Sequence, residues 1–126
     1  MINYVTDLIK IATDIAKDVP VTTTYPETNI VPIIVLYESE QISIYRCSEY
    51  EHAASTITIE IIAKDIPTRN NLKNDIDEFM RDLKYELTKK DDIDNAEAKI
   101  YACKLIYQCE IIQRDGSVHI YSRKNN

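Results

Sequence analysis

The sequence predicts one α+β domain, in which two amphipathic helices pack on one face of a mainly antiparallel sheet of four to five strands. Residues 56–64 alternate apolar and polar side chains, which is typical of a strand with one buried face. After Pro67 the apolar period becomes that of a helix over residues 68–87. Asp115-Gly116, a preferred hairpin centre, lies between two further apolar segments. The predicted order of elements is α-β-β-β-α-β-β.

The first half of the chain begins with a predicted helix over residues 4–19, which Pro20 ends. Residues 21–25 are β-branched and predict a short strand. Residues 30–37 are apolar at both parities, so both faces of that strand should be covered. Two coverings are equally open: the strand is central in the monomer, or a neighbouring subunit buries its second face.

The elements that follow are predicted from polarity and period. Residues 38–41 are polar and predict a turn into a strand over residues 42–46, while residues 47–55 lack a period and predict a loop. In the strand at residues 56–64, the odd-numbered side chains face the core. Thr68 or Asn70 is the expected cap of the second helix, and residues 88–98 are expected to form a charged linker.

The closing hairpin follows from two independent signals. A two-residue turn at Asp115-Gly116 sets Ile111 opposite Ile120 and Gln113 opposite Val118. This register places the apolar side chains of both strands on one face, so turn chemistry and hydrophobic pattern agree.

Composition limits the classes of function. A length of 126 residues suits a single domain over residues 1–126, and one glycine argues against a phosphate-binding glycine loop. The net charge of −6 opposes nonspecific binding to nucleic acid or anionic lipid. No segment resembles a signal peptide or a membrane span. Three cysteines are an odd number, which favours folding in a reducing cytoplasm.

Candidate catalytic and metal-binding residues are few. His52 lies in the predicted loop between two glutamates, and neither it nor His119 has a Cys or His at metal-ligand spacing. Cys47 follows Arg46, a weak version of the cationic environment that activates a thiol. These residues predict no metal, no cofactor and no catalytic site. Nine tyrosines against one phenylalanine and no tryptophan favour surfaces that are dry on one side and wet on the other.

The order of elements resembles the tail terminator and head–tail joining proteins of long-tailed bacteriophages and of phage-derived contractile particles. The resemblance rests on four parts that together cover nearly the whole chain. The first two are the N-terminal helix and the strand with Pro32-Ile33-Ile34-Val35. The other two are the strand-to-helix unit that ends in Asp75-Ile76-Asp77-Glu78-Phe79-Met80, and the hairpin from Tyr107-Gln108-Cys109-Glu110-Ile111 to His119-Ile120-Tyr121-Ser122-Arg123. No residue matches an invariant family residue that could be transferred as a site.

The resemblance implies a noncatalytic structural protein of the virion, assembled in the host cytoplasm. Such a protein forms a ring, commonly hexameric, that caps the tail tube and joins it to the neck or connector protein, with DNA passing through the channel without specific binding. A ring needs two different complementary patches on each subunit. The candidate subunit-interface residues, with Ile34 and Leu36 expected on the second face of their strand, are Ile34, Leu36, Tyr37, Tyr50, His52 and Ile62. The alternative is a small cytoplasmic protein-binding module without catalytic activity.

Overall fold

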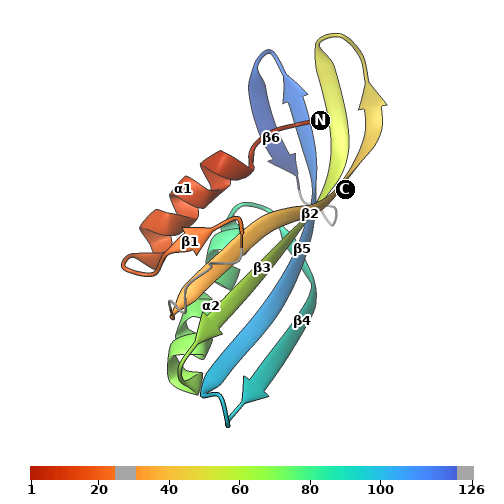
Figure 1. The fold of residues 1–126 in the computed structure, drawn as a ribbon. Helices are drawn as coiled ribbons and strands as arrows, with labels where there is room; N and C mark the ends of the chain where they lie inside the picture. Colours follow the sequence, from red (N-terminus) through yellow and green to blue (C-terminus); the bar gives the residue numbers. More distant parts are fainter. Residues whose placement is uncertain (25–30, 122–126) are drawn as a thin grey trace.

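The computed structural model describes residues 1–24 and 31–121 (Figure 1). In chain order the elements are α1 (Val5–Ala16), β1 (Val21–Thr22), β2 (Ile33–Arg46), β3 (Tyr50–Ala63), α2 (Ile66–Asp82), β4 (Glu86–Asn95), β5 (Ile100–Arg114) and β6 (Ser117–Tyr121). Residues 25 and 30, which are terminal residues of two predicted strands, and the predicted hairpin end at residues 122 and 123 lie outside the described residues.

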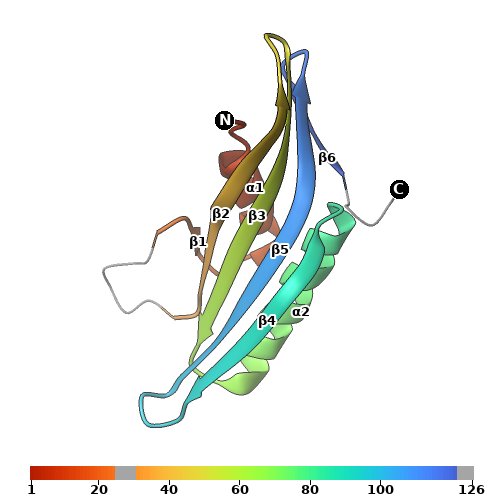
Figure 2. The ribbon, with the colours of Figure 1, turned by 90° about the vertical axis from the view of Figure 1, so that its right-hand side faces the viewer.

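The sheet has six strands in the order β1-β2-β3-β5-β4, and β6 pairs with β5 beyond the start of β4. Every pairing is antiparallel except that of β1 with β2. Both helices cover the same face of this long, twisted sheet (Figures 1 and 2). The predicted α+β class, with a mainly antiparallel sheet and both helices on one face, is confirmed.

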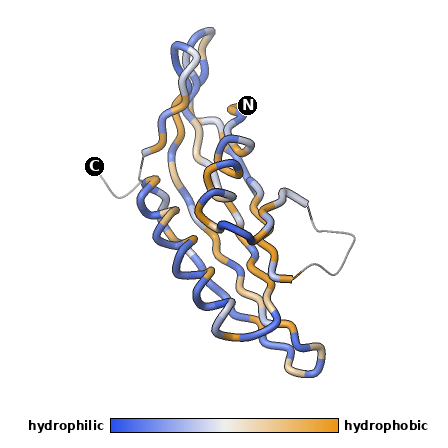
Figure 3. The backbone as a smooth tube through the Cα atoms, turned by 90° about the vertical axis from the view of Figure 1, so that its left-hand side faces the viewer, coloured by the Kyte–Doolittle hydropathy of each residue, from blue (hydrophilic) through white to orange (hydrophobic). Residues whose placement is uncertain are grey.

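The core lies between the helices and the odd-numbered residues of β3 and β5. Ile57, Ile59 and Ile61 are fully buried there, as their alternation predicts. They pack with the buried stripe of α2, which includes Ile76 and Met80. Figure 3 shows hydrophobic and hydrophilic residues alternating along the strands.

The α2 helix begins at Ile66, two residues before its predicted start. Asp65, not Thr68 or Asn70, is the N-cap, and its carboxylate accepts a hydrogen bond of 2.7 Å from the backbone N–H of Thr68. This contact lowers the pKa of the Asp65 carboxyl. Pro67 fits the first turn because the N–H that proline lacks would have no partner in the helix.

The β5–β6 hairpin forms in the predicted register. Ile111 lies opposite Ile120, and Gln113 lies opposite Val118. Asp115 and Gly116 both have positive φ angles, of 52° and 76°, as a two-residue turn of this kind requires.

The predicted turn at residues 38–41 is wrong, because β2 continues through it without reversing. Bulges at Ser39 and Ile44 each absorb one residue, and the strand stays paired with β3 up to Arg46. The chain reverses instead between Arg46 and Tyr50. Residues 38–41 are polar because this strand borders solvent, and they contain no glycine, proline or asparagine to favour a turn.

Two further segments predicted as irregular are strands. Most of the predicted loop at residues 47–55 belongs to β3, where Ala53 and Ser55 face the core and are too small to give an apolar signal. The predicted linker at residues 88–98 is mainly β4, an edge strand. Charged side chains are common on edge strands because they discourage unwanted pairing, so its composition resembles that of a linker.

Candidate interaction surface

The face of the sheet opposite the helices carries no second layer among the described residues, and we call it the helix-free face. It is formed by the even-numbered side chains of β3 and β5 and by the residues of β2, β4 and β6 that pair with them. An apolar row crosses this face on four neighbouring strands, at Ile33, Ile62, Ala102 and Ile93. Ile33 is buried at one end of the row, whereas Ile93 is 58% exposed at the other.

The six predicted interface residues separate into two groups. Ile34 and Leu36 pair with Ile61 and Ile59, so they lie on the helix-covered face and are fully buried within the single chain. Their assignment to a second face available to a neighbouring subunit is therefore wrong. The parity was ambiguous because Ile33 and Val35, on the true second face, are equally apolar and also buried.

The other four predicted interface residues do share one surface. Tyr37, Tyr50, His52 and Ile62 all lie on the helix-free face, and each is partly buried. Nε2 of His52 lies 3.6 Å from Oε2 of Glu110, a pair that is ionic only when the imidazole is protonated. Oε2 of Glu60 is buried on the same face without a hydrogen bond from the described residues.

One end of the sheet extends beyond both helices (Figures 1 and 2). We call this part the hairpin layer; it comprises residues 42–46 of β2, 50–54 of β3, 110–114 of β5, and β6. Large side chains are exposed here: Ile42 by 54%, Tyr45 by 57% and Tyr121 by 44%. The ring of Tyr45 makes an edge contact with that of Tyr50, with centroids 5.7 Å apart. Exposed apolar side chains gathered on one structural unit are typical of a protein contact surface.

A polar network fixes the base of the hairpin layer to the N-terminal segment. The Gln41 side chain accepts a hydrogen bond from the N–H of Ile2 and donates one to its carbonyl, at 2.8 and 2.9 Å. The Ser55 hydroxyl donates to Glu38 at 2.6 Å and is also bonded to the Tyr4 hydroxyl. Burial raises the pKa of Tyr4 well above its ordinary value, so this phenol stays protonated. These contacts connect the base of the hairpin layer to the segment that leads into α1.

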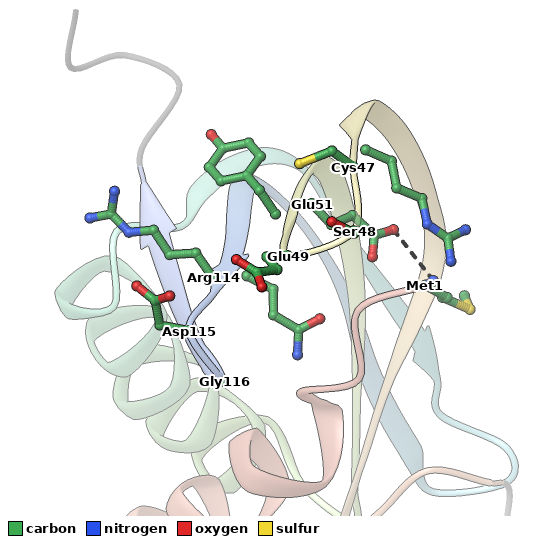
Figure 4. Close-up of a pocket in the computed structure, with 11 residues that line it drawn as sticks. Met1, Cys47, Ser48, Glu49, Glu51, Arg114, Asp115 and Gly116 are labelled. Atoms are coloured by element: carbon green, nitrogen blue, oxygen red, sulfur yellow. Dashed lines mark ion pairs between the residues drawn. The ribbon is translucent and has the colours of Figure 1, made fainter.

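A polar pocket of about 850 Å³ opens between the two hairpin turns (Figure 4). Residues 46–51 line one side and residues 113–116 line the other, and Met1 lies beside the first of these sides. The amino group of Met1 lies 3.3 Å from the Glu51 carboxylate. Cys47 borders the pocket, but His52 does not, so the two candidate catalytic residues are not brought together there.

The other cysteines and the buried arginine are part of the core and of its ion pairs. Burial raises the pKa of the Cys103 thiol to about 11 and that of Cys109 to about 12, and neither forms a disulfide. Arg69 is only 4% exposed and pairs with Asp94 and, at 3.8 Å, with Asp92. The acidic stretch of β4 therefore neutralises a buried cation of α2. Among residues 1–24 and 31–121, no three His, Cys, Asp or Glu side chains gather as a metal site would require.

Comparison of the sequence with protein-family models and with curated proteins gives no match. Among the described residues, no helix has the length and apolar content needed to cross a membrane. The fold and its surface define the class of this protein as an α+β domain with one helix-free sheet face and an exposed hairpin layer at one end. The hairpin layer was not predicted as a unit. The sequence marked only its two halves, one by apolar residues at alternate positions, Ile42 and Ile44, and the other by the turn at Asp115-Gly116.

Proposed function

We propose that this chain is a ring-forming structural protein of a phage tail or a phage-derived tail-like particle. In this role it caps the head-proximal end of the tail tube and joins the tail to the neck, without catalysing a reaction. The proposal combines the resemblance in element order with one structural observation, the unlike edges of the hairpin layer. A ring of identical subunits needs two different contact patches on each copy, since a patch that pairs with itself closes a dimer.

The two edges differ in length and side chains. On one side, β2 has no strand neighbour beyond Val35 among the described residues, and it presents Ile42 and Tyr45 to solvent. On the other side lies β6, a strand of five residues that ends in the exposed Tyr121. An unpaired edge with exposed apolar side chains is a template for pairing with another chain. Two unlike edges of this kind favour head-to-tail association, the type that forms rings.

The charge balance is compatible with a channel for DNA. The net charge of −6 opposes phosphate binding and would let DNA pass without adhering. The two ends of the sheet are available for axial contacts with the tube and the connector, because the hairpin layer and the β4–β5 turn lie at opposite ends (Figure 2). The particle would hold the protein at the head-proximal end of the tail after assembly in the host cytoplasm.

The test is the assembly state of the purified chain, alone and with the tail tube protein encoded in the same genomic region. Multi-angle light scattering at micromolar concentrations and several salt concentrations should detect a closed oligomer, of six copies in the commonest arrangement, alone or on the tube. Electron microscopy should show rings at one end of the tubes. A strict monomer that ignores the tube protein under every condition would refute the proposal and favour the small protein-binding module.

A further inference from the structure

The free edges of the hairpin layer lie at the same level of the sheet. Ile42 is paired with Ala54, Ala54 with Glu110, and Glu110 with Tyr121. Ile42 and Tyr121 therefore end one row that crosses four strands. The adjacent row in the same way begins at Ser43 and ends at Ile120. A second copy placed beside the first at the same height would bring the two ends of each row together.

Strand direction also favours this continuation. β2 is antiparallel to β3, β3 to β5, and β5 to β6, so β2 and β6 of one chain run in opposite directions. A second copy added in the same orientation would thus set its β2 antiparallel to β6 of the first. Antiparallel pairing is slightly more stable per residue than parallel pairing. The alternation of strand directions would pass through the subunit boundary without a break.

The backbone groups at both edges have matching orientations. In a two-residue hairpin the residues that flank the turn, here Arg114 and Ser117, face each other across the ladder. Because orientation alternates along a strand, the backbone groups of Val118 and Ile120 point outward from β6. The same alternation, followed through the ladders of β5, β3 and β2, turns the backbone groups of Ser43 outward from β2.

An independent contact agrees with this orientation. The N–H of Ile34 donates a hydrogen bond of 2.9 Å to the carbonyl of Pro20. This bond points outward from β2, on the side of β1. Counting by alternation from Ile34 and allowing for the bulge at Ser39 again turns the backbone groups of Ser43 outward.

We propose that β6 of one copy pairs antiparallel with β2 of the next, with Ile120 opposite Ser43 and Tyr121 opposite Ile42. This proposal rests on the ring described above and names the contact that builds it. The partner is a second copy of this chain, because its free β2 segment matches the level and direction of β6 and the orientation of its backbone groups. The pair of Tyr121 and Ile42 would cover two side chains that are about half exposed in the single chain.

A disulfide trap tests this contact. Ile42→Cys and Tyr121→Cys are combined in a chain that also carries Cys47→Ser, which removes the exposed native thiol. Across the proposed junction these positions form a non-hydrogen-bonded pair, with Cα atoms about 4.5 Å apart, within the range for a disulfide. Within one chain they are three strand spacings apart, about 14 Å, so they cannot bridge. Mild oxidation should convert the monomer band on a non-reducing gel into a ladder of multimers.

The matched control combines Ile42→Cys with Ile93→Cys in the same background. Ile93 is exposed on β4, which lies beside β5 on the same side as β6 but outside the hairpin layer. This pair should leave the band monomeric. The β6–β2 contact would be refuted, and the ring proposal would stand, in either of two cases. In the first, light scattering detects rings but the Ile42→Cys/Tyr121→Cys pair gives no ladder; in the second, both cysteine pairs give an equal ladder. Absence of any oligomer in the unmodified chain, with or without tube protein, would instead refute the proposed function.

Discussion

Leu36 lies opposite Ile59 in the β2–β3 ladder, and both side chains are fully buried beneath the helices. Leu36→Ala should lower the free energy of unfolding by about 2–5 kcal/mol, since it leaves a cavity in a closed core. Leu36→Asp should unfold the chain because a carboxylate there would have no partner. Urea denaturation followed by circular dichroism measures both. A folded, monomeric Leu36→Asp variant would show that this side chain serves an interface and not the core.

Ile42→Asp should act on assembly without acting on folding. Its side chain is 54% exposed, so an aspartate is tolerated in the single chain, but the charge would be buried beside Tyr121 in the ring. Light scattering should show a shift from the ring to the monomer with an unchanged urea midpoint. Ile93→Asp, on β4, is the control and should leave the ring intact. Equal loss of assembly in both variants would mean that the contact is not confined to the hairpin layer.

The three thiols should differ in reactivity. Cys47 is exposed, whereas Cys103 and Cys109 are buried. A maleimide reagent should label one thiol in the native protein and all three in urea, and Cys47→Ser should abolish native labelling. Fast labelling of Cys103 or Cys109 in the native protein would show that the sheet opens on the timescale of the reaction.

Stability should fall at alkaline pH because Cys103 and Cys109 are buried. Burial raises the pKa of Cys103 to about 11 and that of Cys109 to about 12, from a value of 9.0 without burial. Above pH 9 the unfolded chain loses these protons while the folded chain keeps them, so the free energy of unfolding decreases as pH rises toward 11. Urea midpoints between pH 8 and pH 10.5 measure this decrease. A Cys103→Ala/Cys109→Ala variant should show a shallower decline, and an identical slope would contradict the assignment to these thiols.

The contact of Arg69 with β4 should stabilise the edge of the sheet. Asp92→Asn combined with Asp94→Asn leaves a buried guanidinium without its carboxylates. The expected loss is roughly 1–3 kcal/mol, less than for a fully buried pair because both carboxylates are about half exposed. Asp91→Asn, whose contact with Lys89 is exposed on both sides, should cost little. Equal urea midpoints for the two variants would show that Arg69 does not need these partners.

Polarity alone misled the prediction at the two edges of the sheet. Residues 38–41 and 88–98 are polar, yet most of them are strand residues whose side chains lie at a border with solvent. A local pattern reports what surrounds a side chain, and an edge strand and a loop share the same surroundings. Only the pairing partners, β3 for one segment and β5 for the other, distinguish the two cases.

Local signals were enough to predict three features: the apolar stripe of α2, the alternating core residues of β3, and the register of the β5–β6 hairpin around Asp115-Gly116. Each depends on a period or a turn that neighbouring residues fix. The face of β2 that the helices cover could not be predicted, because residues 33–36 are apolar on both sides of the strand. Only the pairing of Leu36 with Ile59 in the folded chain shows which side faces the helices. The same holds for the hairpin layer with its two unlike edges. Its opposite edges carry Ile42 and Tyr121, which are about 80 positions apart in the chain, and no local pattern relates residues so far apart.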